Sequence, residues 1–145
     1  MDIIIREIEK RDYPAASALL VNDLWNNKIN DDNVILFFDK VKNDENYKTF
    51  VALLNNNTVG LISTVTTIWA AFESANMFIQ GIVVKNEYQN MGIGKKLLKH
   101  TEDYAKSKGI FGIGLQSGVQ RTAAHAFYEH NGYIKSHFYY KNIGS

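Results

Sequence analysis

A glycine-containing turn lies between an apolar segment and an amphipathic one. Val83-Val84 ends the apolar segment, and Gly92-Ile93-Gly94 opens a stretch with helical periodicity. The first backbone N–H groups of a helix have no partner within it, and the helix dipole places a partial positive charge there. Such amides bind anions, and glycine lets an anion approach closely because it has no Cβ. Residues 89–95 are therefore predicted to hold a diphosphate, to which Lys95 and Lys96 could add charge.

Two other phosphate-binding motifs are excluded by spacing. A dinucleotide-binding fingerprint would need glycine at position 97, which is Leu97, and a Walker loop ending at Gly94-Lys95 would need glycine at position 89, which is Gln89. If the turn is considered alone, a purely structural role stays open, in which the glycines only shape a tight turn between strand and helix.

The composition excludes several classes of protein. The chain has 145 residues and a net charge of +1 without a basic cluster, so no nucleic-acid partner is expected. It has no cysteine, which excludes disulfides, thiolate metal sites and a covalent thioester on the protein. The four histidines lack metal-binding spacing. No apolar run is long enough for a signal sequence or a membrane span, so we expect one cytoplasmic domain over residues 1–145, without a membrane partner.

Apolar periodicity predicts the elements that position the turn. The expected strands are Ile3 to Ile8, Thr49 to Leu54, Val59 to Trp69, Met77 to Val84, Ile110 to Gln116 and Tyr133 to Lys141. Two helices follow the first strand, capped by Asp12 and by Asp31 or Asp32; a third runs from Gly94 to Gly109 and a fourth ends near Gly132. Asn55-Asn56-Asn57 predicts a hairpin turn. The order is typical of an α/β domain with a mixed, mainly antiparallel sheet flanked by helices.

Two blocks of the sequence resemble one known family. The first is Val83-Val84 followed by Gln89-x-x-Gly92-x-Gly94 and a helix. The second is Arg121-x-x-Ala124-His125-x-Phe127-Tyr128-Glu129-x-x-Gly132-Tyr133. Together with the element order from Ile3 to Lys141, these blocks resemble the GNAT superfamily of acyl-CoA-dependent N-acetyltransferases. The resemblance implies a single GNAT-like domain that uses acetyl-CoA as a co-substrate and needs no metal.

The resemblance also implies a role for each matched residue. The backbone groups of Ile82, Val83 and Val84 would line the pantetheine arm, and Arg121 would lie near the pantetheine or phosphate end. Tyr128 would donate a proton to the coenzyme sulfur as the thiolate leaves; the alternative is a core tyrosine on the apolar stripe of its helix. The amides expected to cradle the diphosphate belong to Gln89, Asn90, Met91, Gly92, Ile93, Gly94 and Lys95.

The general base is not identified by the sequence. The family often carries a carboxylate on the strand before the turn, but the matching positions hold Gln80 and Gly81, which cannot accept a proton at neutral pH. Glu73, His137 and a water chain are the alternatives, and catalysis by positioning alone stays open.

Three functions remain after these exclusions. The leading hypothesis is direct transfer of acetyl from acetyl-CoA to a primary amine of a small molecule. Acetylation of a peptide amine is the second, and an acyl-CoA-binding module without catalysis is the third, because the strand carboxylate is missing. Aromatic residues such as Trp25, Trp69, Phe37 and Phe38 are expected in the core or around an acceptor pocket. Exposed aromatics on the last predicted strand are compatible with a homodimer.

Overall fold

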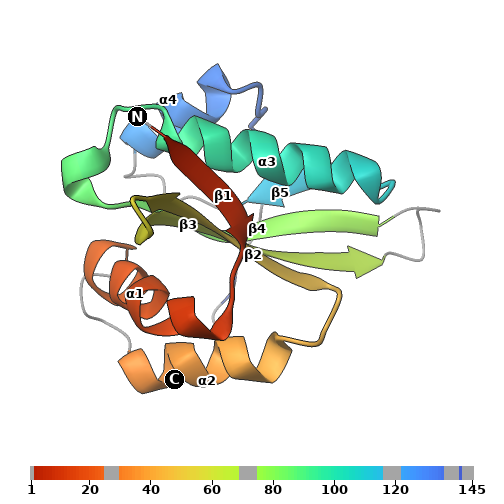
Figure 1. The fold of residues 1–145 in the computed structure, drawn as a ribbon. Coiled ribbons are helices and arrows are strands. Elements are labelled where there is room, and N and C mark those ends of the chain that lie inside the picture. Colours follow the sequence, from red (N-terminus) through yellow and green to blue (C-terminus); the bar gives the residue numbers. More distant parts are fainter. Residues whose placement is uncertain (1, 25–29, 69–74, 116–121, 136–140, 142–145) are drawn as a thin grey trace.

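Five strands form one sheet whose spatial order follows the chain (Figure 1). The structure, a computed structural model, describes residues 2–24, 30–68, 75–115, 122–135 and 141. The strands are β1 (Ile3–Glu7), β2 (Tyr47–Leu54), β3 (Asn57–Ile68), β4 (Ala75–Val84) and β5 (Gly112–Leu115). Neighbouring strands from β1 to β4 are antiparallel, whereas β4 and β5 are parallel. The predicted mixed, mainly antiparallel sheet is confirmed.

Helices cover both faces of this sheet. α1 (Tyr13–Ala18), its π-helical continuation η2 (Leu19–Leu24) and α2 (Asp31–Val41) lie on one face, and α3 (Ile93–Ser107) and α4 (Thr122–His130) lie on the other (Figure 1). Short 3₁₀ segments precede two of the helices, η1 (Lys10–Asp12) before α1 and η3 (Asn86–Tyr88) before α3.

Side chains along β2 alternate between the two cores, as the period of a strand requires. Val51 and Leu53 pack against α1, η2 and α2, whereas Phe50 and Ala52 pack beneath α3. On α3 the residues buried against the sheet include Ile93, Leu97 and Leu98. The sheet is therefore covered on both faces, and β4 carries residues of both cores.

The β2–β3 hairpin turns where the asparagines predicted it. Asn55 and Asn56 have φ angles of 51° and 65°, and β3 begins at Asn57. Two consecutive residues with positive φ suit a tight hairpin turn, and asparagine tolerates that conformation. The hairpin pairs the whole of β2 with the part of β3 from Asn57 to Val65.

The helix caps agree with the sequence in part. Asp12 holds the N-cap position of α1 and Pro14 lies in its first turn, as expected, but the Asp12 side chain makes no cap hydrogen bond to this helix. The predicted cap of α2, Asp31 or Asp32, was wrong. Asn30 is the N-cap, and its side chain accepts a hydrogen bond from the Asp32 amide at 2.7 Å. Asparagine and aspartate cap equally well, so residue type alone did not decide between neighbours.

The predicted element order is confirmed from the first strand through α4. β5 is shorter than predicted among the described residues, and Gln116 lies outside them. The last predicted strand, Tyr133 to Lys141, is not seen among the described residues: 133–135 and 141 are not in a strand, and 136–140 lie outside. The connection at 69–74 and most of the aromatic surface considered for a dimer also lie outside the described residues. Within the described ranges, no helix combines the length and apolar character needed to cross a membrane.

Candidate active site

Among the described residues, β4 pairs with β5 only over the first half of its length. The last pair joining β4 to β5 among the described residues is Ile79 with Leu115. At the same point the pairing of β4 with β3 shifts register: Thr64 pairs with Ile79 and Ser63 with Gly81, which leaves Gln80 as the extra residue of a β-bulge. From Gln80 onward, β4 is thus an edge among the described strands on its β5 side.

The backbone groups at this edge can be assigned from the register. The Lys85 amide donates to the Val59 carbonyl at 2.8 Å, so the Lys85 amide points toward β3. Because direction alternates along a strand, the backbone of Val83 also points toward β3, and that of Ile82 and Val84 points toward the open edge. The Val83 side chain is buried against the α1 side. Of the three residues predicted to present backbone, Ile82 and Val84 therefore have the suitable orientation.

The glycine turn follows directly. Asn90 and Gly92 have positive φ angles of 63° and 80°, and Gly92 is the N-cap of α3. The Gln89 side chain holds the bend, because its Nε2 donates to the Val84 carbonyl at 3.1 Å and to Asn86 Oδ1 at 3.0 Å. The Gln89 amide donates to the Asn86 carbonyl at 3.3 Å.

The amides after Gln89 are available to a ligand. The first hydrogen bond that the start of α3 makes runs from the Lys96 amide to the Gly92 carbonyl at 3.1 Å. Among the described residues, the backbone amides of residues 90–95 have no hydrogen-bond acceptor. Unpaired donors at the N-terminus of a 15-residue helix suit an anion, as the sequence predicted.

Gly94 has a packing role beside this turn. A Cβ on Gly94 would lie 3.2 Å from the ring of Phe127 and 3.9 Å from the Val84 side chain. The missing Cβ therefore lets α4 approach the first turn of α3. Gly92 differs, because a Cβ there would meet nothing within 4 Å, and its positive φ explains the glycine.

Tyr128 lies on α4, next to Phe127. Its half-buried ring lies 5.5 Å from Phe127 and 6.1 Å from Tyr133, measured between centroids. The Tyr133 amide donates to the Tyr128 carbonyl at 3.0 Å, and the Tyr133 hydroxyl donates to Glu102 on α3 at 3.2 Å. Burial, followed by the charge of Glu102 and this hydrogen bond, raises the pKa of Tyr133 well above its usual value. Tyr133 therefore stays protonated and ties the end of α4 to α3.

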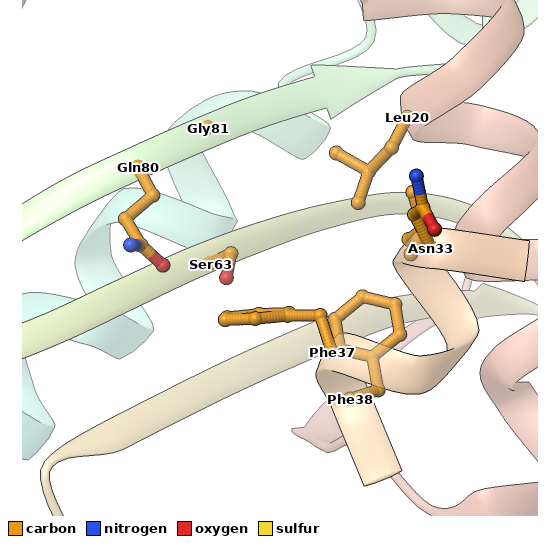
Figure 2. A pocket seen from close by; sticks show the side chains of 8 residues that line it. Leu20, Asn33, Phe37, Phe38, Ser63, Gln80 and Gly81 are labelled. Atoms are coloured by element: carbon orange, nitrogen blue, oxygen red, sulfur yellow. The ribbon is translucent and has the colours of Figure 1, made fainter. Parts of the chain in front are cut away.

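A pocket opens on the opposite face of β4. It has a volume of about 360 Å³ and lies between β3, β4, η2 and α2. In Figure 2, Gln80 from β4 and Phe37 from α2 point toward the same space, with Ser63 of β3 between them. The residues lining the pocket are Leu20, Asn33, Val34, Phe37, Phe38, Ser63, Gln80 and Gly81.

The pocket begins at the bulge, next to the last described pair of β4 with β5. Ile79 is the last β4 residue paired with β5, and the next two residues line the pocket. A group held along the open edge of β4 would thus end where the pocket begins. This arrangement can bring a donor from one face of the sheet to an acceptor on the other.

The comparison with known families agrees with this geometry. Residues 4–133 match the model of the Acetyltransferase (GNAT) family. The chain belongs to this family. The match covers every described helix and strand except the first residue of β1, so the resemblance seen in the sequence is confirmed.

The alignments with individual curated relatives cover less of the chain than the family match does. Aminoalkylphosphonate N-acetyltransferase of Salmonella typhimurium is 33% identical over 95 residues, 66% of this chain and 62% of that protein. The aligned region spans about three fifths of the length of the curated relatives that match.

Two solved structures extend the likeness to nearly the whole chain. A transcriptional regulator from Bacillus halodurans C-125 is 25% identical with a TM-score of 0.89, covering 99% of this chain and 100% of that chain. An aminoglycoside acetyltransferase from an uncultured soil metagenomic sample, solved in complex with trehalose, is 26% identical with a TM-score of 0.79, covering 97% and 96%.

Several predicted residues of this GNAT domain lie outside the described part of the chain. They are Arg121, the two candidate bases Glu73 and His137, and the aromatic residues Trp25 and Trp69. Within the described ranges, no group of three or more metal-ligating side chains was found.

Sequence reasoning did not find Asn33 and Ser63 of the pocket. No local pattern marks them, because they meet only through the β3–β4 register and the packing of α2. Phe37 and Phe38 were foreseen as core or pocket residues, and they serve as both.

Proposed function

We propose that the chain is an N-acetyltransferase that moves the acetyl group of acetyl-CoA directly to a primary amine of a small molecule. The observation that carries this proposal is the arrangement along β4. Among the described residues, the amides of residues 90–95 have no acceptor and no strand pairs with β4 beside Ile82 and Val84, while a pocket begins at Gln80-Gly81. Family membership supports the same chemistry. We also propose that residues 1–145 form a single domain of this kind.

The residues present fit the coenzyme. The amides of residues 90–95 would hold the diphosphate, and hydrogen bonds to a charged acceptor are stronger than neutral ones. The backbone of Ile82 and Val84 would follow the pantetheine arm, leaving the acetyl group near the bulge. Arg121 would pair with phosphate, as the family resemblance implies. The coenzyme supplies an activated acetyl group with a thiolate leaving group.

Three tasks fall to the protein during transfer. The amine must attack as its free base, the carbonyl oxygen gains negative charge, and the thiolate needs a proton or a hydrogen bond. The open-edge amide of Ile82 would polarise the carbonyl, and Tyr128 would donate to the sulfur. A chain without cysteine has no thiol to carry the acetyl group, so transfer is direct.

The identity of the base is a separate proposal. Gln80 and Gly81 line the pocket where a carboxylate would be useful, and neither can take up a proton. We therefore propose that deprotonation proceeds through water or through Glu73 or His137, or that the amine binds already as its free base.

A small-molecule acceptor is favoured over a peptide by the pocket. Its volume of about 360 Å³ lies near the lower end of ordinary ligand sites and suits a compact amine. Two of the similar proteins are named for small-molecule rather than peptide substrates, one an aminoalkylphosphonate and the other an aminoglycoside.

The test is release of free coenzyme A thiol from acetyl-CoA across a panel of small amines and short peptides, with mass spectrometry of each acceptor. We expect amine-dependent thiol release together with an acceptor that gains one acetyl group. Release with peptides alone would favour the second function. Binding of acetyl-CoA without release of free thiol would favour the binding module and contradict the proposal that the chain is an enzyme.

A further inference from the structure

The pocket at the bulge has an apolar body. Four of its lining side chains are hydrocarbon: Leu20, Val34, Phe37 and Phe38. The rings of Phe37 and Phe38 lie 5.8 Å apart at 56°, and Phe37 also meets Tyr47 edge-on at 5.8 Å. These contacts fix the Phe37 ring, so it presents an ordered apolar wall.

The polar groups of the pocket are neutral. They are the side chains of Asn33, Ser63 and Gln80. The Ser63 hydroxyl lies 3.0 Å from that of Thr49 and shares a hydrogen bond with it. The pocket can thus orient a polar atom near Gln80, next to the last described pair of β4 with β5, but no full charge lines it among the described residues.

No charged side chain of the described elements around the pocket lines it. On α2, Asp31 accepts a hydrogen bond from Ser17 of α1, and Asp39 pairs with Lys42 at 3.1 Å. The other charged residues of these elements, none of which lines the pocket, are Asp23, Asp32 and Lys40.

We propose that the acceptor is a primary amine with an uncharged aromatic or branched aliphatic body, and that polycationic and anionic amines are poor acceptors. This inference rests on the proposed function. Moving a charged group from water into an apolar site without a partner is strongly unfavourable, whereas burying hydrocarbon is favourable. The same surroundings favour the neutral form of the reacting amine, which is the form that attacks.

The experiment compares four acceptors with saturating acetyl-CoA: 2-phenylethylamine, ethylamine, 2-aminoethylphosphonate and kanamycin. Ethylamine lacks the aromatic body, so the first pair isolates the contribution of apolar contact. We expect kcat/KM for 2-phenylethylamine to exceed that of the other three by about tenfold or more. A higher kcat/KM for kanamycin or the phosphonate would overturn the inference while leaving an active enzyme. If none of the four acceptors and no amine of the wider panel gave thiol release, the proposed function itself would be overturned.

Two variants test whether this pocket sets the preference. Phe37→Ala removes the apolar wall, and Leu36→Ala is its matched control, because Leu36 is the adjacent α2 residue and is 66% exposed. We expect kcat/KM for 2-phenylethylamine to fall about tenfold in Phe37→Ala, with ethylamine and Leu36→Ala little changed. Equal losses for both amines would contradict the assignment.

Gln80→Glu introduces a negative charge into the pocket and changes the size of the side chain little, so it tests directly whether the lack of charge sets the preference. A carboxylate in the pocket gives a cation a partner, so kcat/KM for kanamycin should rise relative to that for 2-phenylethylamine. An unchanged ratio in this variant, with turnover of 2-phenylethylamine retained, would overturn the inference.

Discussion

Tyr128 is the residue whose proposed role is most open to a direct test. Tyr128→Phe removes only the hydroxyl and keeps the ring that meets Phe127 and Tyr133. We predict that kcat falls about 100-fold, because general-acid assistance is lost, while the affinity for acetyl-CoA stays within about twofold. Steady-state kinetics and a coenzyme titration measure the two quantities. Tyr104→Phe, on α3 against Phe50, is the control. Unchanged turnover would exclude the acid role.

The Arg6–Asp12 pair makes stability depend on pH. The guanidinium binds both carboxylate oxygens, at 2.6 and 3.0 Å, and the Glu9 amide donates to the same carboxylate at 2.8 Å. Burial alone would raise the pKa of Asp12. These hydrogen bonds and the positive charges of Arg6 and Arg11 together lower it by more, so the pKa lies below its usual value. The stabilisation is therefore complete above the unfolded-state pKa and is lost as the pH falls through the folded-state pKa.

Asp12→Asn is predicted to lower the free energy of unfolding at pH 7 by about 2 kcal/mol. The difference from the native chain should shrink below pH of about 4, because the native carboxyl then becomes protonated too. Urea unfolding at several pH values measures this difference. The control is Asp103→Asn, which breaks an exposed pair with Lys99 and should leave stability unchanged. A difference in the free energy of unfolding that stays constant down to pH of about 2 would contradict the assignment of this stabilisation to the ionised Asp12 carboxylate.

At the scale of elements, two substitutions at the start of α3 can distinguish coenzyme binding by a backbone amide from coenzyme binding by a side-chain charge. Lys95 is exposed and its amide lacks an acceptor among the described residues. Proline is tolerated in the first turn of a helix, so Lys95→Pro removes one amide donor, whereas Lys95→Gln removes the charge and keeps the amide. We predict that Lys95→Pro weakens acetyl-CoA binding about tenfold and Lys95→Gln by no more than about threefold, as measured by calorimetry.

The opposite ranking of the two Lys95 variants would mean that charge rather than backbone holds the coenzyme. Circular dichroism and thermal unfolding must first establish that both variants fold like the native chain. A loss of helix in Lys95→Pro alone would be visible in those spectra.

At the scale of the whole molecule, sequence reasoning succeeded where the signal was local. Asn55-Asn56 and Gly92 mark turns because few residues accept positive φ, and both turns are where they were expected. The order of elements followed from periodicity through α4. Neighbouring cap residues were harder, because Asn30 and Asp31 suit the same position.

Features that depend on contacts distant in sequence were not predictable. The bulge at Gln80 arises from the register of β4 against β3, and the pocket needs α2 packed against both strands. The contact between Gly94 and Phe127 likewise joins two helices, so the glycine's packing role was hidden behind its expected role in the turn. The turn and helix of the proposed donor site were therefore readable from the sequence, whereas the proposed acceptor pocket required the fold.

Calorimetric titration of acetyl-CoA into the native chain tests the central claim most directly. The unpaired amides at residues 90–95 beside the open edge of β4 predict saturable binding of one coenzyme per chain. The dissociation constant should lie between about 1 µM and 1 mM, the usual range for enzyme substrates. Absence of saturable binding up to about 1 mM acetyl-CoA would contradict the account, whichever amine is the acceptor.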